Sequence, residues 1–222
     1  MMRRLSCVHH LLWALVCGLS TLSAAADSLD NLSQFLKQAR SGRADFTQTV
    51  TSPPKQGQAA RTKTSTGSFA FMRPGRFRFD YKKPFPQTLV ADGQTFWLYD
   101  PDMGQATARS QAQTLGATPA ALIASSADLS VLQQDFALEA APAADGLAWV
   151  MATPRQKETS VQSVRIGLRV SDAEVTLARL EILDALGQRS LVQFERFELN
   201  PPALAAAQFH FTPPAGVQVI RP

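Results

Sequence analysis

The chain has 222 residues, which is enough for one domain with a sizeable hydrophobic core. Its formal net charge is only +4, and 18% of its residues are charged. This small positive excess argues against a dedicated nucleic-acid-binding protein, which would concentrate many Lys and Arg side chains on one face.

The first 26 residues have the pattern of a secretory signal peptide. Arg3 and Arg4 give a positive start, residues 11–22 form an apolar run, and residues 24–26 are the three alanines of a cleavage site. The apolar run is too short to span a bilayer. We therefore expect cleavage after Ala26, which leaves residues 27–222 as a single secreted domain. Losing Arg3 and Arg4 lowers the formal net charge from +4 to +2.

The exported part is expected to contain no thiol, because Cys7 and Cys17 both lie in the first 26 residues. This excludes disulfides, cysteine nucleophiles and thiolate metal sites. Lipid attachment at Cys17 is disfavoured because the bulky Val16 precedes it. His210 is the one histidine after residue 26. The exported part therefore has few candidate side chains for a catalytic triad or a histidine-rich metal site.

The exported domain is predicted to begin with a helix, and strands follow it along the chain. Apolar residues between Asp27, an N-cap candidate, and Gly42, a candidate stop, predict one amphipathic helix. Two further short helices are predicted at 118–125 and 127–134. About eleven strands of one all-antiparallel domain are expected at 44–50, 62–72, 77–82, 87–91, 94–100, 136–140, 147–153, 161–170, 175–183, 191–199 and 209–211.

The clearest strand has one apolar and one solvated face. Phe77, Phe79 and Tyr81 alternate with charged residues. A sheet of this size must cover its apolar face with a second sheet, with helices or with a bound molecule. The pattern alone favours rings packed as a sandwich core; the alternative is a curved sheet whose concave face receives an apolar ligand beneath helices.

Catalytic motifs are missing from the sequence. It has no phosphate-binding glycine loop, no zinc-protease motif and no nucleophile elbow. Asp100, Asp102 and Gln105 could suggest a site for a hard metal ion, but two acids around a proline are typical of a turn. Arg73, together with the basic side chains that follow it, could bind an anion, yet solvated arginines are favoured. We therefore expect no enzyme, no cofactor and no metal.

Landmarks along the chain, in order, resemble one family. They are Phe46-Thr-Gln, Gly67-Ser-Phe-Ala-Phe, Arg73-Pro-Gly-Arg-Phe-Arg-Phe, Val90-Ala-Asp-Gly-Gln-Thr-Phe-Trp-Leu-Tyr-Asp-Pro, Gln105-Ala-Thr, Thr118-Pro-Ala-Ala-Leu-Ile, Asp184 with Gly187-Gln188, Asn200 and Phe209-His-Phe-Thr-Pro-Pro-Ala-Gly-Val. This series is similar to the LolA family of periplasmic outer-membrane lipoprotein carriers. The resemblance implies an unclosed antiparallel β-barrel with a lid of short α-helices.

The same resemblance implies a function and partners. A periplasmic monomer would ferry acylated lipoproteins from the inner-membrane LolCDE transporter to the outer-membrane LolB receptor. Alternatives are the LolB-like receptor itself, which would need a lipidated cysteine, and another periplasmic lipid-binding module. An outer-membrane barrel would need lipid-facing bands on its strands, whereas the predicted strands carry charges opposite their aromatic residues.

Site residues follow from the resemblance and from alternation. Arg73 is implied to hydrogen-bond carbonyl groups of the lid helices and hold the empty cavity shut, as a planar guanidinium with five donors can do. The residues expected to line an acyl-chain cavity are Phe46, Phe69, Phe71, Phe77, Phe79, Trp97, Tyr99, Leu122 and Ile123. Because Phe96 and Leu98 occupy the other face of the same strand, that strand's assignment could be inverted.

Overall fold

The computed structural model describes residues 23–54, 57–115, 124, 128–156, 159–172 and 174–222. Within these residues, twelve strands form one sheet with the order β12-β6-β5-β4-β3-β2-β1-β11-β10-β9-β8-β7. The strands are β1 (Ser41–Ser52), β2 (Arg61–Met72), β3 (Arg76–Lys83), β4 (Gln87–Asp92), β5 (Thr95–Asp100), β6 (Gln105–Ser110), β7 (Phe136–Ala144), β8 (Leu147–Pro154), β9 (Val161–Val170), β10 (Val175–Asp184), β11 (Arg189–Leu199) and β12 (Gln218–Ile220).

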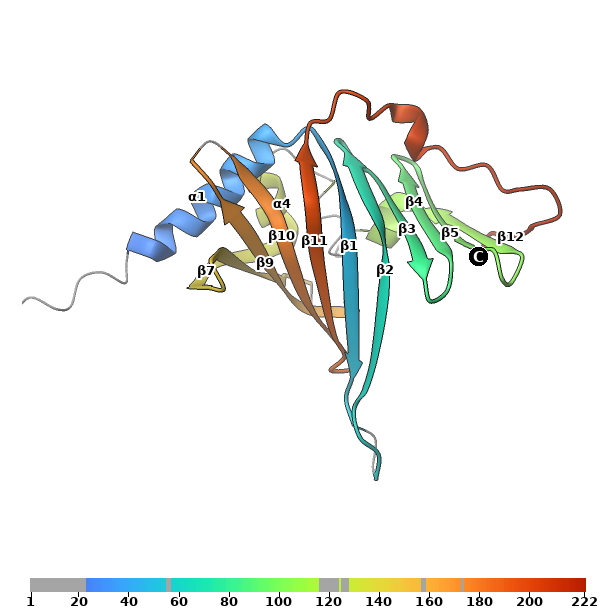
Figure 1. Ribbon diagram of the computed structural model, residues 1–222, viewed down its shortest axis with the longest axis horizontal. Helices are drawn as coiled ribbons and strands as arrows, with labels where there is room; N and C mark the ends of the chain where they lie inside the picture. Colours follow the sequence, from blue (N-terminus) through green and yellow to red (C-terminus); the bar gives the residue numbers. More distant parts are fainter. Residues whose placement is uncertain (1–22, 55–56, 116–123, 125–127, 157–158, 173) are drawn as a thin grey trace, which may run out of the picture.

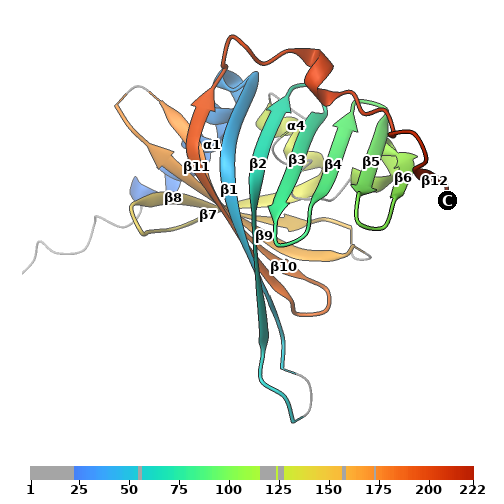
Figure 2. The ribbon, with the colours of Figure 1, turned by 45° about the vertical axis from the view of Figure 1, so that its right-hand side comes forward.

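The sheet twists and curls without closing. Its edges are β12 and β7, at opposite ends of the strand order. Figures 1 and 2 show the β7–β10 half passing behind the β1–β5 half, with helices on the enclosed side. Helix α1 (Ser23–Gln38) packs on β7, β8, β9 and β10, and α4 (Leu129–Asp135) packs on β7. The expected mainly β, unclosed barrel is confirmed.

Ten of the eleven predicted strands are present, and the predicted strand at 209–211 is wrong. Residues Ala206–Phe209 form a short 3-10 helix, η1, which packs on β3 and β4. The sequence prediction also missed β6 and β12, and the pairing between them is parallel, so the sheet is not all antiparallel. The buried side chains of β6 are only the small Ala106 and Ala108, and β12 has three residues, so neither strand has a strong alternating apolar pattern.

The first helix differs from its prediction at both ends. It begins at Ser23, so Asp27 lies inside it, and Gly42 lies in β1 rather than after a helix stop. Asn200 closes the helix end instead: its Oδ1 accepts from the N–H groups of Arg40 and Ser41 at 2.9 and 3.0 Å, and its Nδ2 donates to the Gln38 carbonyl at 2.8 Å. A side chain 160 positions away thus supplies the cap. The helix predicted at 127–134 is α4, whereas most of 118–125 lies outside the described residues.

Glycine lets two inner-face rings meet across β2. Gly67 pairs with Phe46 on one side and Tyr81 on the other, and these two rings lie edge to face at 5.0 Å. A Cβ at Gly67 would stand 2.1 Å from the carbonyl oxygen of Asp80 and 2.8 Å from the Phe46 ring. The close approach of neighbouring strands here requires glycine.

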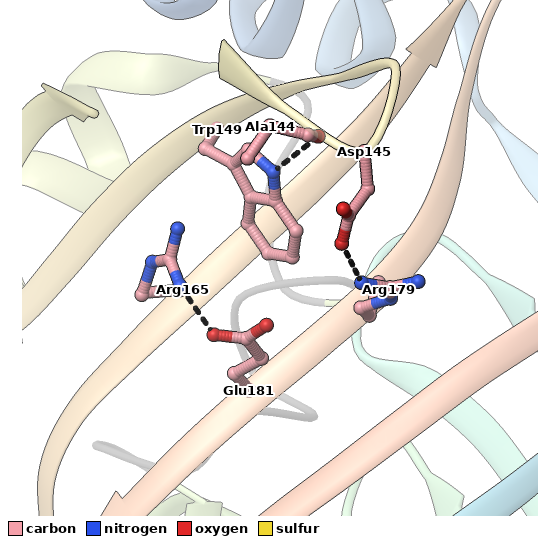
Figure 3. A network of polar contacts seen from close by, with 6 residues as sticks. All are labelled: Ala144, Asp145, Trp149, Arg165, Arg179 and Glu181. Carbon is pink, nitrogen blue, oxygen red and sulfur yellow. Dashed lines mark hydrogen bonds and ion pairs between the residues drawn. The ribbon is translucent and has the colours of Figure 1, made fainter. Parts of the chain in front are cut away.

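The outer face of the β7–β10 half has a small core of its own. Trp149 of β8 covers Gly167 of β9, and its ring lies between the guanidinium groups of Arg165 and Arg179, 4.5 and 5.8 Å from the ring centroid (Figure 3). Arg165 pairs with Glu181 at 2.6 Å, and Arg179 pairs with Asp145 at 2.8 Å. The indole N–H donates to the carbonyl of Ala144 at 3.0 Å. This cluster thus buries a large ring on the convex side of the sheet.

The stability of the fold at high pH should depend on Tyr81. Its hydroxyl donates to Oε1 of Gln48 at 2.8 Å, and burial raises its pKa to about 12. A tyrosine in the unfolded chain ionises near pH 10, so the unfolded state loses this proton first as the pH rises. The stabilisation is present below about pH 10 and is lost as the pH rises toward 12. Urea unfolding from pH 8 to 12 should therefore show a steeper loss of unfolding free energy for the wild-type protein than for Tyr81→Phe, and parallel curves would contradict this.

Candidate functional site

Five of the predicted cavity residues share the concave face of the sheet. Phe46 lies on β1, Phe69 and Phe71 on β2, and Phe77 and Phe79 on β3; all are at most 2% exposed except Phe79, which is partly buried. Their rings form a continuous series with neighbouring centroids 4.5 to 6.1 Å apart. We call this set, with Tyr81, the aromatic face.

Trp97 and Tyr99 do not belong to the aromatic face, so this part of the prediction is wrong. β5 pairs with β4 so that Phe96 faces Ala91 and Trp97 faces Val90, which places Phe96 beside Phe77 on the inner side, with ring centroids 6.1 Å apart. Trp97 and Tyr99 instead contact Phe211 of the C-terminal segment, each at 5.4 Å. Residues 96–99 of this strand are all bulky and aromatic or aliphatic, so alternation gave no polar side to mark the outside.

Sequence reasoning also missed three inner-face phenylalanines. Phe194 of β11 lies 5.2 Å from Phe69, and Phe197 and Phe35 lie 6.4 Å from Phe71. The alternation of Val192 and Phe194 could have revealed the first of these. Phe35 could not be assigned to this face, because only the packing of α1 on the sheet decides where its apolar stripe lies.

The described helices cover the concave side with apolar side chains. Leu32, Phe35 and Leu36 of α1 are at most 2% exposed and belong to the same core as the aromatic face. Leu132 of α4 also joins this core. Leu122 and Ile123, predicted to contribute from the lid, lie outside the described residues. In the described conformation, the rings of the aromatic face are therefore in contact with one another, and Phe71 is in contact with Phe35 of α1.

Arg73 connects the sheet to the end of α1. It follows β2, and its Nη1 donates to the carbonyl oxygen of Leu36 at 2.9 Å and to that of Ala39. Its backbone N–H donates to the carbonyl of Arg40 at 2.8 Å. Carbonyl groups at a helix C-terminus lack intrahelical donors and carry partial negative charge, so a guanidinium both satisfies and complements them.

The environment of the Arg73 guanidinium is aromatic and poorly hydrated. Its carbon lies 5.4 Å from the ring centroid of Phe35 and 5.2 Å from that of Phe71. Burial lowers the pKa of Arg73 to about 10, which leaves it charged at neutral pH. This cation is held by ring faces and by carbonyl dipoles at the end of α1, so its stabilisation depends on α1 staying in place.

The other polar candidates have structural partners. The Asp100 carboxylate accepts from the N–H of Met103 at 3.0 Å within the β5–β6 turn, and no cluster of metal-ligating side chains occurs among the described residues. Arg78 pairs with Asp80 at 2.6 Å, and Arg76 donates to the Asp92 carbonyl at 3.2 Å. Neither arginine supports an anion site.

A pocket of about 500 Å³ lies on the outer face rather than the concave one. Its walls include residues of β1, β2, β3 and β11, with Leu204 and Gln208 from the C-terminal segment. Its arginines are paired with neighbouring carboxylates, as in Arg43 with Glu198 at 2.7 Å. The pocket is thus lined by satisfied ion pairs and differs in chemistry from the aromatic face.

No helix in the described part of the chain is both long and apolar enough to cross a bilayer.

Comparison with known proteins identifies the family. The sequence model of the family described as outer membrane lipoprotein carrier protein LolA matches residues 37–212 of this chain. An outer-membrane lipoprotein carrier protein of Albidiferax ferrireducens is 58% identical over 198 residues, covering 89% of this chain and 92% of the relative. One from Methylibium petroleiphilum is 49% identical, with 94% of this chain and 96% of the relative covered.

The fold agrees with a solved structure. The crystal structure of a LolA superfamily protein from Nitrosomonas europaea aligns with a TM-score of 0.50 and 14% identity, over 84% of this chain and 97% of that chain. At this identity the similarity concerns the fold alone, whereas the family match and the two close relatives concern the sequence itself. The chain belongs to the LolA family of outer membrane lipoprotein carrier proteins.

Proposed function

We propose that this protein carries lipoproteins through the periplasm and shelters their acyl chains against the aromatic face. The observation that carries the proposal is an extended concave face of phenylalanine rings, covered by α1 and fastened by Arg73, in a chain of the LolA family. Its close relatives are named outer-membrane lipoprotein carrier proteins.

The physical need for such a carrier is large. Transfer of one methylene from water to an apolar environment is worth about 0.8 kcal/mol, so one long acyl chain gains roughly 10 kcal/mol when it is sheltered. A soluble protein can supply that shelter with an open sheet whose inner face is apolar and whose outer face is charged. Arg43, Asp45 and Arg78 lie on the outer face, opposite the rings.

Cover by α1 makes binding reversible. Because the rings contact each other and Phe71 contacts Phe35 of α1, an acyl chain enters when the helix moves away, and the lost contacts weaken net binding. Return of α1 to the rings and to Arg73 would then favour release of the cargo. We propose that the inner-membrane LolCDE transporter drives loading and that the outer-membrane receptor LolB accepts the cargo, so the carrier needs no nucleotide site and performs no catalysis.

A LolB-like receptor is the second candidate. It would need a lipidated cysteine, and the chain has only Cys7 and Cys17, both within the predicted signal peptide. The match of the LolA model and of carriers over most of the chain favours the carrier.

The location and the mature start are tested together. We expect the protein purified from the periplasmic fraction to be a monomer that begins at Asp27 and has no lipid, because residues 24–26 supply the cleavage site. N-terminal sequencing and intact mass would check this. A lipid-modified N-terminus at Cys17 in the membrane fraction would instead support the receptor.

Arg73→Leu should shift the balance between retention and delivery. The variant loses charge-assisted hydrogen bonds to the Leu36 and Ala39 carbonyls, each worth on the order of 1.5–3 kcal/mol in the covered state. Lipoprotein should then be held more tightly and delivered to the receptor less well, because release no longer recovers those bonds. Arg73→Lys should deliver partly, since an ammonium keeps the charge but lacks the planar fork.

The measurement is lipoprotein retained by the carrier against lipoprotein delivered to the receptor. Arg109→Leu, at an exposed arginine of β6, is the matched control and should behave as the wild-type protein. Equal retention and delivery in the wild-type protein and both Arg73 variants would leave Arg73 without a role in transport.

Photo-crosslinking separates the two faces of the sheet. A benzoylphenylalanine at position 79, on the aromatic face, should capture an acylated lipoprotein. The same group at position 97, on the outer side against Phe211, should capture little. A matched pair of aromatic positions is thus compared in one assay, and preferential capture from position 97 would place the cargo on the wrong side of the sheet for this proposal.

A further inference from the structure

A glutamine distant in the sequence holds the turn that carries Arg73. Gln111, the first residue of α2 (Gln111–Leu115), is only 9% exposed. Its Nε2 donates to the carbonyl oxygen of Gly75 at 2.6 Å, and its Oε1 accepts from the N–H of Gly93 at 2.9 Å. One carboxamide therefore bridges the β2–β3 turn and the β4–β5 turn.

Each of the two turns presents a backbone group to the carboxamide of Gln111. Gly75 and Gly93 have φ values of +69° and +105°, so neither position continues the ladder of a strand. The Gly75 carbonyl and the Gly93 N–H are both within hydrogen-bond distance of the same carboxamide, and an amide side chain, which has both a donor and an acceptor, satisfies both. Gln111 is itself fixed, because its backbone N–H donates to the Gln94 carbonyl at 2.8 Å.

The bridged turn is the one that meets α1. Gly75 follows Arg73 by two residues, and its own N–H donates to the carbonyl of Ala124 at 2.7 Å. On the other side, the Arg73 backbone donates to Arg40 and its guanidinium donates to Leu36. The short segment 73–75 is thus held between the end of α1 and Gln111.

We propose that Gln111 is a positioning residue that sets where the Arg73 guanidinium meets the last turn of α1. Loss of its carboxamide lets the turn shift and weakens the hold of Arg73 on the helix. The link to cargo rests on the proposed function, but the effect on α1 does not. It can therefore be measured on the protein without cargo.

The test is amide hydrogen exchange on three variants. Gln111→Met keeps an unbranched side chain of similar size but has no amide, and Gln113→Met is the matched control at an exposed glutamine of the same helix. Gln111→Met should speed exchange at Gly93 and in the last turn of α1 about fivefold, the effect of one neutral hydrogen bond, while Gln113→Met stays within about twofold of wild type. Faster exchange at Gly93 with an unchanged α1 would overturn the proposal.

A third variant keeps the test decisive if Gln111→Met does not fold. Gln111→Glu retains the acceptor for Gly93, but as a carboxylate it offers no donor to Gly75. Gly93 should stay protected while the last turn of α1 exchanges faster. If both sites keep wild-type protection, the proposal fails.

Coupling to Arg73 distinguishes positioning from general packing. If Gln111 acts through Arg73, Gln111→Met should change α1 exchange by less than about twofold in the Arg73→Leu background. Full additivity would overturn the proposal. Cargo retention in the same variants separates the two ideas: if Arg73→Leu leaves retention unchanged while α1 exchange responds to Gln111, the carrier proposal fails and the positioning role stands.

Discussion

The concave face of an unclosed sheet is the constraint on which the rest of this structure depends. A closed barrel covers its interior by its own curvature, but here β12 and β7 remain separate edges, so the interior must be covered by something else. Helix α1 provides much of that cover with Leu32, Phe35 and Leu36. This cover is an element separate from the sheet, with its own attachments.

Those attachments lie at one end of α1 and are mainly polar. Asn200 caps the backbone after the helix, and the Arg73 guanidinium donates hydrogen bonds to carbonyl groups at the end of the helix. The apolar contacts along the helix are the ones that an acyl chain could replace, whereas the hydrogen bonds at the end have no equivalent in lipid. In the proposed function, the balance between covered and open states is therefore set by a few directional bonds added to a large non-directional apolar contact.

The large rings on the outer face of the sheet have fixed partners. Trp149 lies between two arginines that are each paired with a carboxylate, and Phe211 covers Trp97 and Tyr99. Large rings occur on both sides of the sheet, but on the convex side they are fixed by charged partners or by the C-terminal segment. On the concave side, the described cover is made by separate helices, of which α1 is held at its end by Asn200 and Arg73.

Local pattern in the sequence determined the class of fold and much of the site. Alternation of apolar and charged residues specifies the strands and the inward position of Phe77 and Phe79, because successive side chains of a strand point to opposite faces. The same rule failed for 96–99, where every side chain is bulky and apolar, and only the pairing of β5 with β4 placed Phe96 inside and Trp97 outside. The family motifs identified Arg73, while its chemistry explains its hold on helix carbonyls. Which carbonyls it binds, and that Gln111 and Asn200 hold the same corner, depend on contacts between residues that lie far apart in the chain, and tertiary structure alone decides these.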